Sequence, residues 1–88
     1  MYFDAMDVYV SVGSDGYAYG SIDYSFSGAE NIFSVHGQVS GAYSSSAVCG
    51  FENITSTGFT CYVTGTGRTS AVDGRSFQVR MIIFFEPE

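Results

Sequence analysis

Short stretches in which apolar and polar residues alternate run through the whole chain, separated by turns rich in glycine, serine and aspartate. Alternation with a period of two places every second side chain on the same face, which is the pattern of a half-buried β-strand. The stretches follow one another at steps of about 8 to 16 residues, a spacing typical of an all-β sandwich or barrel. The expected strands are Val8–Val12, Tyr17–Ser27, Ile32–Ser40, Ala47–Phe51, Phe59–Val63 and Phe77–Phe85.

The clearest piece of local structure is a β-hairpin whose turn is expected at Ile54–Gly58. Cys49 on one strand and Cys61 on the other each stand between apolar residues at a period of two, so both thiols are expected to point into the core. Free cysteine is among the most buried residue types, which favours two buried free thiols. A disulfide between them is the alternative, and a metal site would need His36 and a fourth ligand that no zinc-motif spacing supplies.

The stretch Ile32–Ser40 predicts a strand with two distinct faces. Phe33, Val35 and Val39 share one face and are expected to lie in the core. His36, the only histidine, falls on the opposite face and is expected to point to solvent or to a subunit contact. This position favours a structural role over acid–base work.

The last strand ends in an apolar run, Ile82–Phe85, that does not alternate. A strand that is apolar on both faces must be covered on both, either by the sheets of its own domain or by another subunit. The acidic tail Glu86–Glu88 is expected to end the strand, because its proline cannot donate a hydrogen bond to a sheet. Residues 1–14, which contain the first strand, are expected to belong to a fibre neck or to a trimer contact.

The composition supports a single β domain covering residues 1–88. A chain of 88 residues holds one core and is marginal alone, so a partner subunit is expected to help stabilise it. Charged residues make up 14% and aromatic residues 17%, and the chain has neither lysine nor leucine. Helical bundles and coiled coils depend on alanine, leucine, glutamate, lysine and arginine, so the composition excludes them.

The net charge of −6 comes from nine acidic and three basic residues. Because binding to phosphates needs several cations on one face, we expect no nucleic-acid partner. No apolar run approaches the ~20 residues that cross a membrane, and the N-terminus has no basic segment followed by an apolar block. We therefore expect no membrane insertion and no signal peptide, with synthesis in the cytoplasm and a final place in a virion or outside the cell.

No constellation of residues rises above chance as a catalytic, metal or cofactor site. The carboxylates are scattered singly in turns or on solvent faces, and Asp73 is explained by an Asp-Gly turn. Gly65–Gly67 lacks the lysine and the helix of a phosphate loop. No serine stands in a strand-turn-helix elbow, so His36 has no nucleophile to activate. We predict a non-enzymatic protein without cofactor or metal, whose tyrosine, serine and glycine residues suit polar recognition.

Most of the chain resembles the H-type lectin domain, the family of discoidins and snail agglutinins, with relatives at the ends of phage tail fibres. The likeness is carried by the strand Ser21–Phe26 (SIDYSF), by the hairpin Phe51–Phe59 (FENITSTGF) with its Thr-Gly-Phe end, and by the alternating strand Phe77–Ile83. The resemblance implies a six-stranded antiparallel β-sandwich that forms a trimer and binds carbohydrate near its subunit boundaries.

The chain also departs from that family, because it has no tryptophan in its final strand and no arginine on the strand before the hairpin. The ligand-binding residues we expect are Tyr62, Arg68, Asp73 and Arg75, since they lie on or beside the loop where the family recognises its ligand.

These features favour a trimeric receptor-binding module, the distal domain of a phage tail fibre or a related protein, that contacts cell-surface glycan or polysaccharide. One alternative is a structural trimerisation or folding cap of a fibre, with Val8–Val12 and Ile82–Phe85 forming the contacts between subunits. A second alternative is an acidic phage-encoded inhibitor of a host protein.

Overall fold

The computed structural model describes every residue from Met1 to Glu88 and contains six β-strands. The strands are β1 (Tyr2–Ser11), β2 (Tyr19–Ser25), β3 (Ala29–Ser40), β4 (Ala47–Thr55), β5 (Gly58–Gly65) and β6 (Ser76–Pro87). Three short 3-10 turns lie between strands: η1 (Ser44–Ser46), η2 (Thr66–Arg68) and η3 (Ser70–Val72). The prediction of an all-β chain is confirmed, and no helical segment has the length and apolar character that a membrane crossing requires.

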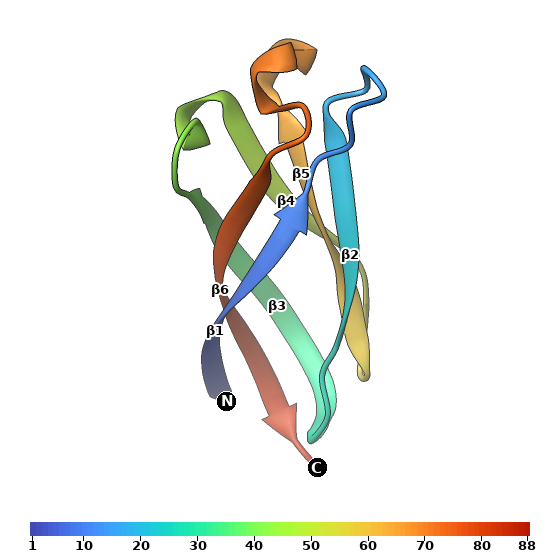
Figure 1. Ribbon diagram of the computed structural model, residues 1–88. Coiled ribbons are helices and arrows are strands. Elements are labelled where there is room, and N and C mark those ends of the chain that lie inside the picture. Colours follow the sequence, from blue (N-terminus) through green and yellow to red (C-terminus); the bar gives the residue numbers. More distant parts are fainter.

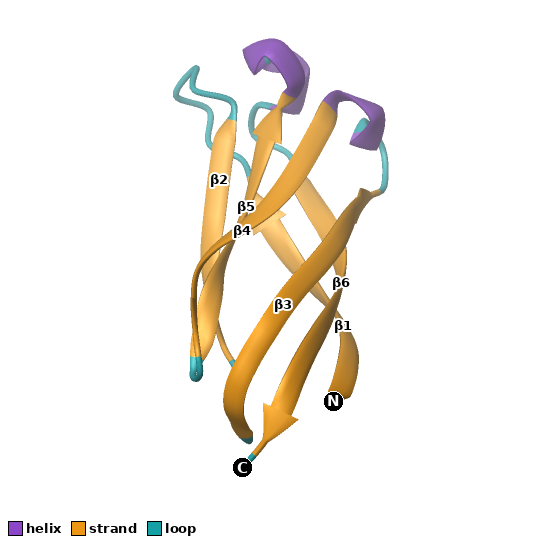
Figure 2. Cartoon of the chain, turned by 180° about the vertical axis from the view of Figure 1, so that it is seen from behind, coloured by secondary structure: helices purple, strands orange, loops and turns teal.

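The strands form two antiparallel three-stranded sheets that pack face to face (Figure 1). One sheet has the order β1-β6-β3 and the other the order β2-β5-β4. Only β4 and β5 form a hairpin within one sheet, whereas every other connection passes from one sheet to the other. The strand directions bring the β1–β2, β3–β4 and β5–β6 connections to one end, called here the loop end, and both termini to the opposite end (Figures 1 and 2).

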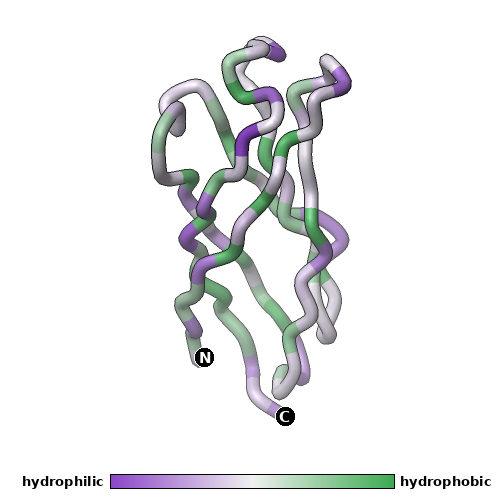
Figure 3. The backbone as a smooth tube through the Cα atoms, in the orientation of Figure 1, coloured by the Kyte–Doolittle hydropathy of each residue, from purple (hydrophilic) through white to green (hydrophobic).

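The core lies between the two sheets, where the inward side chains of alternating strands meet. Val10, Val63 and Val79 are fully buried, and so are Phe77 and Ile83. Hydrophobic positions recur along each strand with hydrophilic ones between them (Figure 3). The faces predicted for Val8–Val12, Phe59–Val63 and the first half of the last strand are therefore confirmed.

The prediction for the third strand was wrong at Phe33, which is 48% exposed. The pairing of β3 with β6 shifts register between Ile32 and Ser34, so a β-bulge inserts one extra residue there. The bulge lets Ile32 and Val35 both face the core although they are three positions apart, and it turns Phe33 outward. His36 lies on the exposed face as predicted, edge-on to Phe84 with 5.9 Å between ring centres.

Several strands begin or end elsewhere than the pattern predicted. β1 begins at Tyr2 rather than Val8 and pairs with β6 over its whole length. β4 continues to Thr55, past a bulge at Asn53, which has a left-handed φ of 55°. β6 runs through Pro87, so the acidic tail does not end it at Glu86. β1 begins at Tyr2, which pairs with Phe85, so the last two residues of β6 have a neighbouring strand only on the β3 side. A proline is tolerated at such an edge.

The final apolar run does alternate in the structure. Ile83 is fully buried between the sheets and Phe85 points to the same side, where Phe26 packs edge-on against it at 5.0 Å between ring centres. Ile82, 39% exposed, and Phe84 lie on the outer face of sheet β1-β6-β3. The domain's own sheets therefore cover one face of the run and leave the other open.

Candidate functional site

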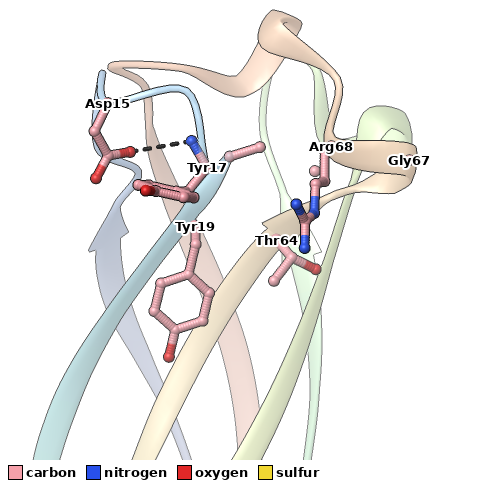
Figure 4. Close-up of a pocket in the computed structure, with 8 residues that line it drawn as sticks. Asp15, Tyr17, Tyr19, Thr64, Gly67 and Arg68 are labelled. Atoms are coloured by element: carbon pink, nitrogen blue, oxygen red, sulfur yellow. Dashed lines mark hydrogen bonds between the residues drawn. The ribbon is translucent and has the colours of Figure 1, made fainter.

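A cleft of about 590 Å³ opens at the loop end between the β1–β2 connection and the start of the β5–β6 connection (Figure 4). We call it the loop-end cleft. Its walls include Asp15, Tyr17, Tyr19, Thr64, Gly67 and Arg68. Concave sites that combine aromatic rings with a few convergent polar groups are the usual form of a ligand site.

Pairing between β2 and β5 brings these residues together although they come from distant parts of the sequence. Tyr19 is the register partner of Thr64, and the backbone N–H of Gly65 donates to the carbonyl of Ala18 at 2.9 Å. On the other wall, the carboxylate of Asp15 accepts a hydrogen bond from the backbone N–H of Tyr17 at 3.1 Å (Figure 4). This local turn orders the connection that carries Tyr17.

The backbone of the cleft is strained at two non-glycine positions. Ala18 has a φ of 53° and Arg68 a φ of 58°, both in the left-handed region. That conformation costs an ordinary residue roughly 1–2 kcal/mol relative to glycine, and it tends to persist where a site requires it. The residue in this strained conformation at position 68 is an arginine, whose long cationic side chain lies at the mouth of the cleft.

Arg68 is an exposed cation without an ion-pair partner, since the one salt bridge of the chain joins Arg80 to Asp7. Its guanidinium carries planar N–H donors suited to hydroxyl, carbonyl or carboxylate oxygens. In Figure 4 Arg68 lies beside Thr64 on one wall of the cleft, and Asp15 and Tyr17 lie together on the opposite wall. The cleft therefore offers a free donor group and an acceptor group to the same ligand.

Tyr62, a predicted ligand residue, lies beside the cleft on the outer face of sheet β2-β5-β4. Its ring stacks on that of Tyr19 with centres 6.1 Å apart and planes 23° from parallel. Its hydroxyl end lies over Gly50 of the neighbouring strand, where a Cβ would overlap the ring. Because Tyr19 lines the cleft, Tyr62 extends the same surface along the sheet.

Arg75 and Asp73, the other two predicted residues, occupy different places. The Arg75 guanidinium lies 3.6 Å above the centre of the Tyr43 ring, and its Nε donates to the carbonyl of Ala71 at 2.7 Å. Arg75 therefore fastens the β3–β4 connection to the β5–β6 connection. Asp73 is half-buried, and its Oδ1 is shielded from solvent without a hydrogen-bond partner. Neither residue lines the cleft.

The sequence-based prediction missed Asp15, Tyr17 and Tyr19. Asp15 belongs to the carboxylates that the sequence places in turns or on solvent faces, and Tyr17 and Tyr19 fall in the stretch expected to form the second strand. The available signal was a Ser-Asp-Gly turn followed by Tyr17-Ala18-Tyr19, which is the kind of aromatic loop that recognition surfaces use.

The remaining reactive groups do not form a site. Both cysteines are free; Cys61 is fully buried and Cys49 half-buried. Burial raises the pKa of the Cys61 thiol to about 11, with a smaller contribution from Cys49, and burial also raises the pKa of Cys49. A raised pKa lowers the thiolate fraction that nucleophilic chemistry needs. No group of three or more metal-ligating side chains occurs.

No family model, curated protein or solved structure matches the chain. The function must therefore be argued from the loop-end cleft, its tyrosines and its free arginine.

Proposed function

We propose that the chain is a non-enzymatic carbohydrate-recognition module, resembling the H-type lectin domain, that contacts cell-surface glycan as part of a phage tail fibre or a related receptor-binding protein. The observation that carries this proposal is the loop-end cleft, which an unpaired Arg68 lines together with a carboxylate and two tyrosines. The two sheets of three strands agree with the sandwich that the resemblance implies.

A sugar ring presents C–H groups on one face and hydroxyl groups around its edge. The C–H face packs against an aromatic ring such as that of Tyr19, which is 42% exposed. The hydroxyls need both donors and acceptors, and Arg68 supplies the first while Asp15 supplies the second. The positive charge of Arg68 and the negative charge of Asp15 balance, so the cleft suits a neutral polyhydroxylated ligand.

Glycan-array binding, followed by binding to bacterial surface polysaccharide, tests this proposal with the substitution Arg68→Gly. Glycine relieves the left-handed backbone at position 68, so the variant is expected to be more stable than the wild type by about 1 kcal/mol. The same change is expected to weaken glycan binding by about tenfold or more, because hydrogen bonds from a charged group are worth roughly 1.5–3 kcal/mol.

Arg75→Ala serves as the matched control, because it removes an arginine from the same connection but outside the cleft. It is expected to leave glycan affinity unchanged. Absence of any glycan binding by the wild-type chain would remove the recognition proposal.

A second candidate function is assembly, with the domain acting as a trimerisation or folding cap. It is favoured by an exposed apolar group at the terminal end of sheet β1-β6-β3, called here the terminal patch, which consists of Phe3, Ile82 and Phe84. Phe3 is 67% exposed and lies 6.2 Å from Phe84 between ring centres. An outward sheet face is ordinarily polar, so apolar residues gathered there mark a contact surface.

Sedimentation velocity at micromolar concentration tests the assembly function. The wild-type chain is expected to sediment as a trimer, and Phe3→Ser is expected to dissociate it. Tyr9→Ser is the control, because Tyr9 is equally exposed at 66% on the same face of the same strand but outside the patch. A stable wild-type monomer would sink this function.

A further inference from the structure

Tyr19 and Tyr62 form a tyrosine platform that continues the loop-end cleft down the outer face of sheet β2-β5-β4. Tyr19 stands in the register row of Thr64, next to the cleft. Tyr62 stands in the next outward-facing row, between Ser21 and Gly50. Rows on one face of a sheet are two residues apart, roughly 6.6–6.8 Å, so the second ring lies about that much farther from the cleft.

Gly50 determines how the second ring lies. The Tyr62 side chain crosses from β5 towards β4, and its hydroxyl end occupies the space that a Cβ at position 50 would fill. One side of the ring is thereby covered by the β4 backbone, and Tyr62 is half-buried. A tyrosine held against the sheet in this way offers a preorganised surface at low entropic cost.

The groups around the platform indicate the charge of the ligand. Below Tyr62 the next row contains Asp23, Thr60 and Glu52, in which the Thr60 hydroxyl donates to the Asp23 carboxylate at 2.8 Å. These groups accept hydrogen bonds from hydroxyls and repel anions, and the whole chain carries a charge of −6. No arginine stands on these three strands, all three arginines lying between residues 68 and 80. The platform therefore disfavours phosphates and acidic sugars.

We propose that the ligand is a chain of at least two neutral sugar units, one held in the loop-end cleft and the next stacked on Tyr62. This inference rests on the proposed carbohydrate function and specifies its ligand as an oligosaccharide rather than a single terminal sugar. The stacked pair Tyr19–Tyr62 provides the continuous apolar surface along which the glycan runs from one row to the next.

The test compares the monosaccharide, disaccharide and trisaccharide fragments of the glycan that gives the strongest array signal, by titration calorimetry. The wild type is expected to bind the disaccharide about threefold to tenfold more tightly than the monosaccharide, the range that one aromatic contact supplies. Tyr62→Ala is expected to abolish this gain and to leave monosaccharide affinity unchanged. Tyr62→Phe keeps the ring and is expected to retain the gain.

Gly50→Ala gives a second, independent perturbation that leaves Tyr62 in place. The added Cβ overlaps only the far end of a flexible side chain, so the ring is tilted off the sheet while the fold is kept. It is expected to reduce the disaccharide gain as Tyr62→Ala does. Tyr9→Ala, which removes an exposed tyrosine from the other sheet, is the control and is expected to change nothing.

The outcomes separate the two proposals. Monosaccharide binding that is sensitive to Arg68→Gly but gains nothing from a second sugar overturns the oligosaccharide inference and leaves the carbohydrate function standing. A gain that survives both Tyr62→Ala and Gly50→Ala likewise overturns it. Failure of the wild type to bind any array glycan overturns both.

Discussion

The substitution Gly20→Ala is expected to destabilise the fold strongly, because at Gly20 the backbone of β2 lies against the backbone at the end of β1. A Cβ at position 20 would overlap the carbonyl oxygen of Ser11, and it would lie 2.7 Å from the carbonyl carbon of Ser11 and 3.0 Å from the Cα of Val12. All three are backbone atoms, so no side chain can rotate away. The strands must separate, which strains the hydrogen bond from the Gly13 N–H to the Tyr19 carbonyl at 3.1 Å.

Overpacking in a filled site typically costs 1–3 kcal/mol, and the strained hydrogen bond adds to it, so we expect a loss of about 3 kcal/mol in the free energy of unfolding. In a domain of this size each kilocalorie shifts the melting temperature by roughly 4–8 °C. Thermal unfolding followed by circular dichroism is therefore expected to show a fall in melting temperature of about 12–24 °C.

Gly13→Ala is the matched control for this experiment. Gly13 lies in the same crossing region, but the nearest atom to a Cβ there is the Asp15 Oδ1 at 3.5 Å, an ordinary contact. The control is expected to change the free energy of unfolding by less than about 0.5 kcal/mol. A Gly20→Ala variant as stable as Gly13→Ala would refute the close approach of the two strands.

Three further predictions concern the Cys61 thiol, the Arg75–Tyr43 contact and the Asp73 carboxylate. Because the folded state raises the pKa of Cys61 to about 11 from 9.0, it keeps a proton that the unfolded chain releases, so stability is full below pH 9 and falls by about 2–3 kcal/mol between pH 9 and 11. Urea unfolding across that range should show a shallower fall for Cys61→Ala. A double-mutant cycle of Arg75→Ala and Tyr43→Ala is expected to give a coupling energy of about 0.5–1 kcal/mol, and a coupling near zero would contradict the cation–π contact. Asp73→Ala removes a shielded oxygen that has no hydrogen-bond partner, so chemical denaturation is expected to show no loss of stability, and a loss above about 1 kcal/mol would mean that the carboxylate has a partner.

The positions of the six strands could be predicted because alternation is a local signal. Val79 and Met81, or Cys61 and Val63, each appear at a period of two in the sequence, and all four are buried. Local alternation does not reveal where a bulge shifts the inward-facing positions by one residue. The bulge near Phe33 inserts one residue, and after it the pattern continues on the other face, so a prediction that kept a single phase placed Phe33 in the core.

The sequence pattern also does not predict which strands pair with one another. The pairing of Tyr2 with Phe85 joins the two ends of the chain, and nothing in either segment specifies the other. The loop-end cleft depends on the same kind of information, since Tyr19 and Thr64 meet only through the β2–β5 pairing. The resemblance indicated Arg68 as a candidate through the loop that carries it, whereas the residues that surround Arg68 in space could not be predicted.

An even number of strands, running alternately towards and away from the loop end, places both termini at the opposite end, where β1 and β6 are paired side by side. The loop-end cleft and the terminal patch therefore lie at opposite ends of a body 42 Å long. A neighbour held through the terminal patch would leave the cleft open, so the proposed assembly and the proposed glycan binding would not compete for the same surface. On this reasoning, a carrier protein fused to either terminus leaves glycan affinity unchanged, whereas a short insertion after Gly67, on the cleft wall, abolishes it. Equal losses from both would mean that the ligand is bound at the terminal end instead.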